Sequence, residues 1–186
     1  MTTWSGRTSD GAYGLLIEEP ALRDLDRMCR DAGAIETGGV LVGRYSADLV
    51  VAIVREATPP PSDSRRGRSW FERGIAGLRE MLGRRWRAKE RTYYVGEWHF
   101  HPATLIVPSS DDFSQMVQIA HAQQYDCREP LLVILGASES QGVRSLRAFV
   151  CPVGSPLELL PVKEPREPQG GARRGCVDGS EPAVGA

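Results

Sequence analysis

The sequence lacks paired cysteines and long apolar segments. Its 186 residues include Cys29, Cys127, Cys151 and Cys176, which are widely separated and form no CxxC pair. Neither a disulfide framework nor a cysteine-type zinc site is therefore indicated. The sequence has no run of about 18 apolar residues, and residues 1–10 have no apolar segment typical of a signal peptide. We expect a protein of the reducing cytoplasm that spans no membrane.

The overall charge lacks a dominant sign. The chain has 23 Lys and Arg residues against 24 Asp and Glu residues, for a net charge of −1. Such a balance argues against general affinity for nucleic acid or for membrane surfaces. Positive charge is concentrated locally, because arginines outnumber glutamates between residues 65 and 91.

Length and periodicity predict one α/β (α+β) domain at residues 11–160, with a mixed central β-sheet flanked by helices. Strands are expected at 13–17, 40–45, 49–57, 92–100, 131–135 and 146–150, and helices at 20–29, 72–89 and 110–123. We expect a flexible N-terminus at 1–10, an exposed loop at 58–68 and a disordered tail at 161–186. The tail is mostly Pro, Gly, Arg and Glu and has no Leu, Ile, Met or aromatic residue, a composition that cannot form a core.

Two histidines one residue apart, His99 and His101, lie at the end of a predicted strand. Strand alternation places them on the same face, where two imidazoles can converge on one metal ion. Asp112 falls in the first turn of the next predicted helix, where the unpaired amides and the helix dipole keep a carboxylate ionised. Two neutral imidazoles and one carboxylate can hold a Zn²⁺ and leave its fourth position for water. The three residues therefore predict a zinc site.

Further polar residues supply the other parts of a hydrolytic site. Glu36, which precedes two glycines that allow close backbone approach, can accept a proton, and Ser109 can stabilise an oxyanion. Ser109 and Asp112 also match a capping box, a role compatible with catalysis. Glu97 shares the face of the two histidines and competes for the role of base. We interpret it as a residue that orients a ligand histidine, or as a solvated residue.

The spacing of these residues excludes three other classes of zinc hydrolase. A zinc deaminase needs HxE and PCxxC, and a zincin needs HExxH; the chain has none of these. A metallo-β-lactamase has an Asp-His after HxH, where this chain has Pro102-Ala103.

The motif resembles that of the JAMM (MPN+) family of zinc isopeptidases, which is a Glu followed at a distance by HxH, seven residues, Ser, two residues and Asp. Two flanking segments are also similar to prokaryotic members, Glu36-Thr37-Gly38-Gly39-Val40-Leu41-Val42-Gly43 and Gly96-Glu97-Trp98-His99. The resemblance covers roughly residues 12–155. It implies a single JAMM/MPN domain with a cytidine-deaminase-like architecture.

The resemblance also implies a role for each matching residue. One Zn²⁺ per chain would be held by His99, His101 and Asp112. Glu36 would be the general acid and base, and Ser109 would stabilise the oxyanion.

The activity implied by the resemblance is hydrolysis of the (iso)peptide bond after the C-terminus of a ubiquitin-like protein, in precursor processing or deconjugation. The tail of that substrate would add as a strand beside residues 40–45. The flanking residues resemble those of deubiquitinase-like proteases from bacterial ubiquitin-like conjugation operons, including operons of anti-phage defence, which implies E1/E2-type partners.

Two alternative functions remain open. One is processing of a ubiquitin-fold sulfur-carrier protein. The other is a non-catalytic MPN scaffold that docks partners through the arginine-rich helix expected at 72–89. Neither the identity of the ubiquitin-like protein nor the oligomeric state follows from the sequence.

Overall fold

The fold is a strand-rich barrel with helices packed on its outside. The computed structural model describes residues 3–102, 106–138 and 144–162. The barrel strands are β1 (Thr3–Arg7), β2 (Gly14–Glu18), β3 (Thr37–Tyr45), β4 (Val51–Ala57), β7 (Tyr93–Phe100), β8 (Leu131–Ser138), β9 (Arg144–Val150) and β10 (Leu157–Pro161). They close in the order β1-β10-β9-β8-β7-β3-β4-β2. The remaining elements are α1 (Glu19–Ala32), β5 (Arg65–Arg66), β6 (Phe71–Glu72), α2 (Leu78–Arg87), α3 (Ser110–His121) and the short 3₁₀ helix η1 (Gln123–Tyr125).

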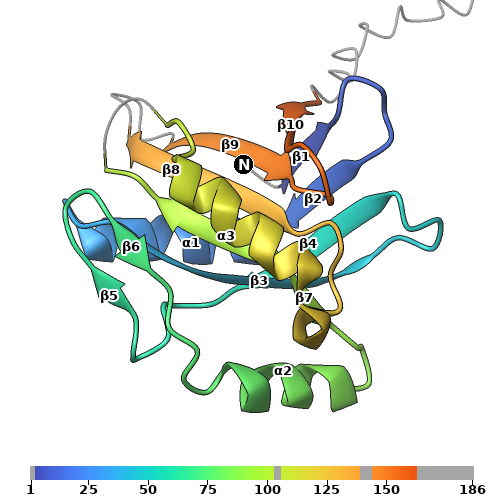
Figure 1. The fold of residues 1–186 in the computed structure, drawn as a ribbon, viewed down its shortest axis with the longest axis horizontal. Coiled ribbons are helices and arrows are strands. Elements are labelled where there is room, and N and C mark those ends of the chain that lie inside the picture. Colours follow the sequence, from blue (N-terminus) through green and yellow to red (C-terminus); the bar gives the residue numbers. More distant parts are fainter. Residues whose placement is uncertain (1–2, 103–105, 139–143, 163–186) are drawn as a thin grey trace, which may run out of the picture.

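The mixed α+β fold expected from the sequence is confirmed. β2 and β4 pair in parallel, as do β7 and β8, whereas the other barrel neighbours are antiparallel. α3 crosses one face of the sheet in Figure 1, and α1 lies behind it. The cytidine-deaminase-like architecture stays a prediction.

Two apolar clusters lie on opposite sides of β7. Trp98 and Phe100 pack in the cluster that includes α1 residues such as Leu25. Met116 of α3 packs in the other cluster with Leu132 of β8. Alternation along β7 therefore points Trp98 and Phe100 toward α1 and leaves the opposite face, which carries Tyr94 and His99, toward α3.

The expected flexibility of residues 1–10 is wrong for β1. Thr3–Arg7 form a strand that pairs with β2 and with β10 near the other end of the described chain. Trp4 packs against the first apolar cluster. The pairing with β10 joins residues far apart in sequence, so local pattern could not reveal it. The expected tail at 161–186 lies outside the described residues apart from 161–162.

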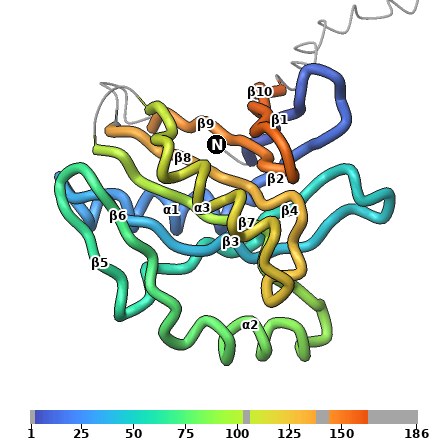
Figure 2. Tube along the Cα trace, in the orientation of Figure 1, coloured from blue at the N-terminus to red at the C-terminus, as the bar shows by residue number. Residues whose placement is uncertain are grey.

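The helix expected at 72–89 is shorter in the structure, where α2 spans Leu78–Arg87. Glu72 belongs instead to β6, and the carboxylate of Asp63 accepts the backbone N–H groups of Ile75 and Ala76 at 3.0 and 2.9 Å. These bonds hold the segment in a turn, and Ile75 is 68% exposed rather than part of an apolar helix face. Figure 2 shows the long β4–β7 connection, residues 58–92, running out through β5, β6 and α2 before returning to the barrel.

The segment expected to receive an added substrate strand is not an edge. β3 pairs with β4 on one side and with β7 on the other. Leu41, Val42 and Gly43 therefore already have strand partners on both sides, and a substrate tail cannot add along them without displacing one of those partners.

Candidate metal centre and catalytic site

The two histidines come from the most enclosed part of the sheet. His99 lies opposite Gly38 of β3 and Ile134 of β8, and it is 3% exposed. His101 follows the end of β7, where its backbone N–H donates to the carbonyl of Leu135 at 2.9 Å. Both histidines are therefore held by backbone bonds of the barrel rather than by a free loop.

Asp112 comes from the first turn of α3, and Ser109 is the N-cap of that helix. The Ser109 backbone N–H and hydroxyl donate to Oδ2 of Asp112 at 2.6 and 2.7 Å, and Ser109 Oγ accepts the Asp112 N–H at 3.1 Å. This is the capping box that the sequence predicts. Burial alone would raise the pKa of Asp112, but its hydrogen bonds with His99 and Ser109 lower the pKa to about 2. The carboxylate is therefore ionised at neutral pH.

The structure brings the three predicted metal ligands together. His99, His101 and Asp112 each offer a ligand atom, and these atoms lie within 4.8 Å of one another. His99 Nδ1 is 2.6 Å from Asp112 Oδ1, and His101 Nε2 is 3.8 Å from Asp112 Oδ2. Two imidazoles and a carboxylate match the donor set of a catalytic zinc site.

The electrostatics of the cluster favour a bound cation. Burial lowers the pKa of His99, but the hydrogen bond with Asp112 and the nearby Glu97 carboxylate raise it to about 9. Burial lowers the pKa of His101, which favours its neutral, metal-binding form. Nδ1 of His99 faces Asp112, so it is the nitrogen placed to bind a metal, and the buried Nε2 atom, which has no hydrogen-bond partner, would carry the proton. The Glu97 carboxylate lies 3.7 Å from Nε2 and offers that proton an acceptor, so the residues present fit a zinc ion.

Glu36 lies at the start of β3, beside the same cluster. Its backbone N–H donates to the carbonyl of Gly67 at 2.9 Å, and its side chain is partly buried. Burial raises the pKa of its carboxyl group, and the negative charge of Asp112 raises it further. A raised pKa suits a group that must accept and return a proton.

Gly38 and Gly39 lie where the backbone of β3 approaches the site, as expected from the sequence. A Cβ atom added at Gly38 would clash with the carbonyl of Trp98 and lie 2.6 Å from the ring of Phe71. A Cβ atom added at Gly39 would clash with the carbonyl of Thr58. Larger side chains would therefore push β3 away from β7 and from the covering segment.

Glu97 is fully buried, so its interpretation as a solvated residue is wrong. Its carboxylate accepts hydrogen bonds from Arg73 Nε at 2.7 Å, Gln115 Nε2 at 2.8 Å and the Tyr94 hydroxyl at 3.3 Å. Its Oε2 atom lies 3.7 Å from Nε2 of His99. Reasoning from the sequence missed Arg73 and Gln115, because nothing in their local pattern shows that they meet Glu97.

The segment expected as an exposed loop at 58–68 leads into the β5–β6 hairpin, and this hairpin covers the site in part. The ring of Phe71 in β6 meets His99 edge to face, with 5.6 Å between ring centres. Arg66 in β5 lies 3.5 Å from the Thr37 hydroxyl, and Gly67 accepts the Glu36 N–H. The β5–β6 hairpin therefore forms a wall beside the candidate metal ligands and the candidate base.

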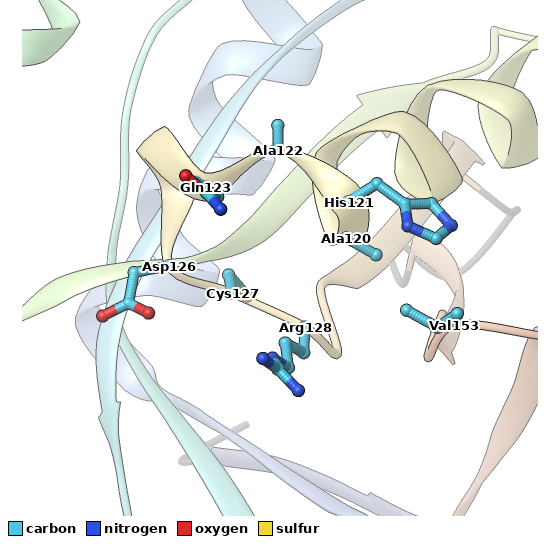
Figure 3. A pocket seen from close by; sticks show the side chains of 8 residues that line it. All are labelled: Ala120, His121, Ala122, Gln123, Asp126, Cys127, Arg128 and Val153. Carbon is cyan, nitrogen blue, oxygen red and sulfur yellow. The ribbon is translucent and has the colours of Figure 1, made fainter.

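A separate cavity of about 350 Å³ lies at the other end of α3. It is lined by His121 and by Gln123, Asp126 and Arg128 of the chain that follows (Figure 3). His121 is nine residues beyond Asp112, or about 14 Å along a helix, so this cavity is distinct from the metal ligands. His121 is exposed.

None of the helices in the described ranges combines the length and apolarity needed to cross a membrane.

The chain is similar to known proteins over most of its length. A family model described as "Prokaryotic homologs of the JAB domain" matches residues 18–149. The chain is 45% identical over 157 residues to a CD-NTase/cGAS isopeptidase from Enterobacter hormaechei subsp. hoffmannii, a match that covers 83% of this chain and 86% of that protein. It is 35% identical over 102 residues to a CD-NTase/cGAS isopeptidase from Pseudomonas aeruginosa, which covers 54% of this chain and 63% of that protein.

The fold is also similar to the solution structure of a protein from Desulfitobacterium hafniense. The TM-score is 0.54 with 22% sequence identity, and the match covers 76% of this chain and 87% of that chain. At this level of identity the likeness shows the fold alone.

Proposed function

The chain belongs to the family of prokaryotic JAB-domain homologues, and from this premise we propose that it is a zinc-dependent isopeptidase. It would hydrolyse the (iso)peptide bond after the C-terminus of a ubiquitin-like protein. The observation that carries the proposal is the convergence of His99, His101 and Asp112 within 4.8 Å, next to a carboxyl group with a raised pKa, that of Glu36. A scaffold has no need for this combination.

His99, His101 and Asp112 would hold the zinc ion. When bound, zinc would supply Lewis acidity, which polarises a carbonyl group and makes water a better nucleophile. The buried His99 imidazole would keep its proton on Nε2, facing the carboxylate of Glu97. The ring is thereby fixed in one tautomer.

Glu36 would move the proton that hydrolysis requires. Its carboxylate accepts a proton from the attacking water and returns it to the leaving amine. The leaving amine is a lysine side chain in deconjugation and a backbone amine in precursor processing. The raised pKa of Glu36 favours the return of the proton.

Ser109 would donate a hydrogen bond to the oxyanion that forms at the cleaved carbonyl. Its hydroxyl proton points to Asp112 Oδ2 in the structure, and Oγ accepts the Asp112 N–H. Rotation about the Cβ–Oγ bond can turn the proton toward substrate while Oγ keeps its role in the helix cap. One hydroxyl can thus serve both functions.

The curated relatives point to the kind of substrate. They are named CD-NTase/cGAS isopeptidases. We infer that the substrate is a conjugate or precursor of a ubiquitin-like protein in a bacterial conjugation pathway of anti-phage defence, with a CD-NTase/cGAS-type protein as the target. E1/E2-type partners and a cytoplasmic location belong to the same proposal.

The test combines metal analysis with cleavage assays on the purified full chain. Fusions of candidate ubiquitin-like proteins to a reporter, through a lysine side chain or through the backbone, should be cut after the last ubiquitin-like residue. The protein should contain one equivalent of zinc. Zinc-loaded protein that leaves every fusion intact would overturn the proposal.

The same assays distinguish the alternatives. A sulfur-carrier processing enzyme would cut only the fusion of a sulfur carrier, and its gene would lie beside biosynthetic genes rather than E1/E2 genes. A scaffold would bind no stoichiometric zinc, and its partner binding would be indifferent to Glu36→Gln.

A further inference from the structure

A buried polar cluster joins the β4–β7 connection to the metal ligands. Arg73, in the turn between β6 and α2, has a side chain that is 4% exposed, and the side chain of Glu97 is fully buried. Both are charged groups removed from water. A buried pair is weak evidence for stability, because an apolar pair of similar volume is often as stable or more stable.

The guanidinium of Arg73 is held in one orientation. Its Nε donates to Glu97 Oε1 at 2.7 Å, its Nη2 to the hydroxyl of Tyr125 at 2.8 Å and its Nη1 to the carbonyl of Gly74 at 2.9 Å. The turn that carries Arg73 is itself fixed, because the Gly74 N–H donates to Ser64 Oγ at 3.0 Å. The planar fork therefore presents a single N–H direction to Glu97.

The two oxygens of Glu97 have different partners. Oε1 accepts from Arg73 and from the hydroxyl of Tyr94 at 3.3 Å. Oε2 accepts from Gln115 of α3 at 2.8 Å and lies 3.7 Å from His99 Nε2, the buried nitrogen that lacks a partner. Because Arg73 and Tyr94 occupy Oε1, the carboxylate keeps Oε2 toward His99.

We propose that Arg73 is a positioning residue of the metal centre, which acts through Glu97 to fix the ring of His99. Arg73 contributes charge and direction to Glu97, and Glu97, 3.7 Å from Nε2 of His99, would receive the Nε2–H of the ligand histidine when metal is bound. The β4–β7 connection thereby contributes to metal affinity as well as to the wall of the site. This inference rests on the proposed zinc-dependent function for its metal.

The experiment is a double-mutant cycle on the full chain, with zinc affinity measured by chelator competition in the absence of substrate. The variants are Arg73→Met, Glu97→Gln and the combination of the two. Loss of a group that orients a metal ligand weakens binding by roughly 10- to 100-fold. We expect each single variant to show such a loss, and the combination to lose no more than Glu97→Gln alone, because Arg73 acts through Glu97.

Two further variants exclude a general effect of arginine removal. Arg73→Lys keeps the positive charge but not the fork, so its zinc affinity should lie between those of the wild type and Arg73→Met. Arg65→Met removes an arginine from the neighbouring hairpin, where it forms an exposed pair with Glu72 at 3.7 Å. It should bind zinc as the wild type does.

Three results would overturn the inference: unchanged zinc affinity in folded Arg73→Met, additive losses in the combination, or an equal loss in Arg65→Met. Where Arg73→Met fails to fold, Arg73→Lys and the combination carry the test, since the combination leaves no unpaired buried charge. A kinetic readout separates positioning from substrate contact, because the buried Arg73 should affect kcat and leave KM nearly unchanged. If wild-type protein binds zinc but cleaves nothing, the proposed function is wrong. The zinc affinities of the double-mutant cycle would still test the role of Arg73.

Discussion

Nδ1 of His99 lies 2.6 Å from Oδ1 of Asp112, although the residues are 13 positions apart in different kinds of element. His99 belongs to a barrel strand and Asp112 to the first turn of α3. The contact between them joins two separate local features, a strand histidine and a helix-capping carboxylate, into one group that could hold a metal ion.

Replacing Glu36 with Gln should separate metal binding from turnover. The amide keeps the shape of the side chain but cannot accept the proton of the attacking water. Zinc content should stay near one equivalent, while kcat should fall by roughly 10²- to 10⁴-fold. The control is Glu19→Gln on the exposed face of α1, where Glu19 forms an ion pair with the exposed Arg23 at 2.7 Å. Glu36→Gln protein with wild-type turnover would remove Glu36 from the mechanism.

The acid limb of kcat/KM should reflect the raised pKa of Glu36. Burial and the charge of Asp112 raise it above the ordinary 4.5. Because only the ionised carboxylate can accept a proton, activity should fall as the pH drops through this raised value, which lies above 4.5. Zinc content must be measured at each pH to exclude metal loss. An acid limb at or below 4.5, with zinc retained, would contradict this assignment.

Two variants of Ser109 should separate capping from oxyanion stabilisation. Ser109→Ala loses the helix cap, at a cost of about 1 kcal/mol of unfolding free energy, whereas a glycine cap costs only about a few tenths. Both variants lack the hydroxyl, so both should lose roughly 10²- to 10³-fold in kcat. Unfolding curves and steady-state rates measure the two effects. If Ser109→Gly keeps full activity, Ser109 acts only as a cap.

Gly38→Ala should destabilise the site, because the added methyl group would meet the Trp98 carbonyl and the Phe71 ring. Overpacking of this kind typically costs about 1–3 kcal/mol. Gly83→Ala in α2 is the matched control, since its added Cβ would make only ordinary contacts, the nearest at 3.5 Å from Arg87. It should stabilise the helix by up to about 1 kcal/mol. Thermal unfolding compares the pair, and equal effects would contradict the tight approach of β3 to β7.

Removal of zinc should lower the thermal stability of the wild type. Binding to the folded state alone stabilises by about 2.7 kcal/mol at a free concentration 100 times the Kd. Chelation should therefore lower Tm, and added zinc should restore it. The same titration on His101→Ala should give a much smaller shift, because one of the three ligands is missing. A chelator-insensitive Tm would argue against a zinc site.

The mixed α+β class, the two histidines on one face and the capping box were accessible from the sequence. Strand alternation makes His99 and His101 co-facial in any sheet, and Ser109 with Asp112 begins a helix by local hydrogen bonds alone. These features depend on neighbours within a few residues. Strand β1 was not accessible, because it depends on pairing with β10, which is far away in the sequence. The start of α2 was not accessible either, because it depends on hydrogen bonds to Asp63, which lies outside the helical pattern.

The sequence by itself therefore determined the pattern of His99, His101, Ser109 and Asp112 and the strand and helix that carry them, from which their roles are predicted. Only the tertiary structure decided that β3 has partners on both sides, that the β5–β6 hairpin is a wall of the site and that Arg73 reaches Glu97. The physical reason is that capping hydrogen bonds are formed within one helical turn, and the alternation of side chains is set within one strand. The closure of the barrel and the partners of a buried charge depend on segments that meet only when the chain has folded.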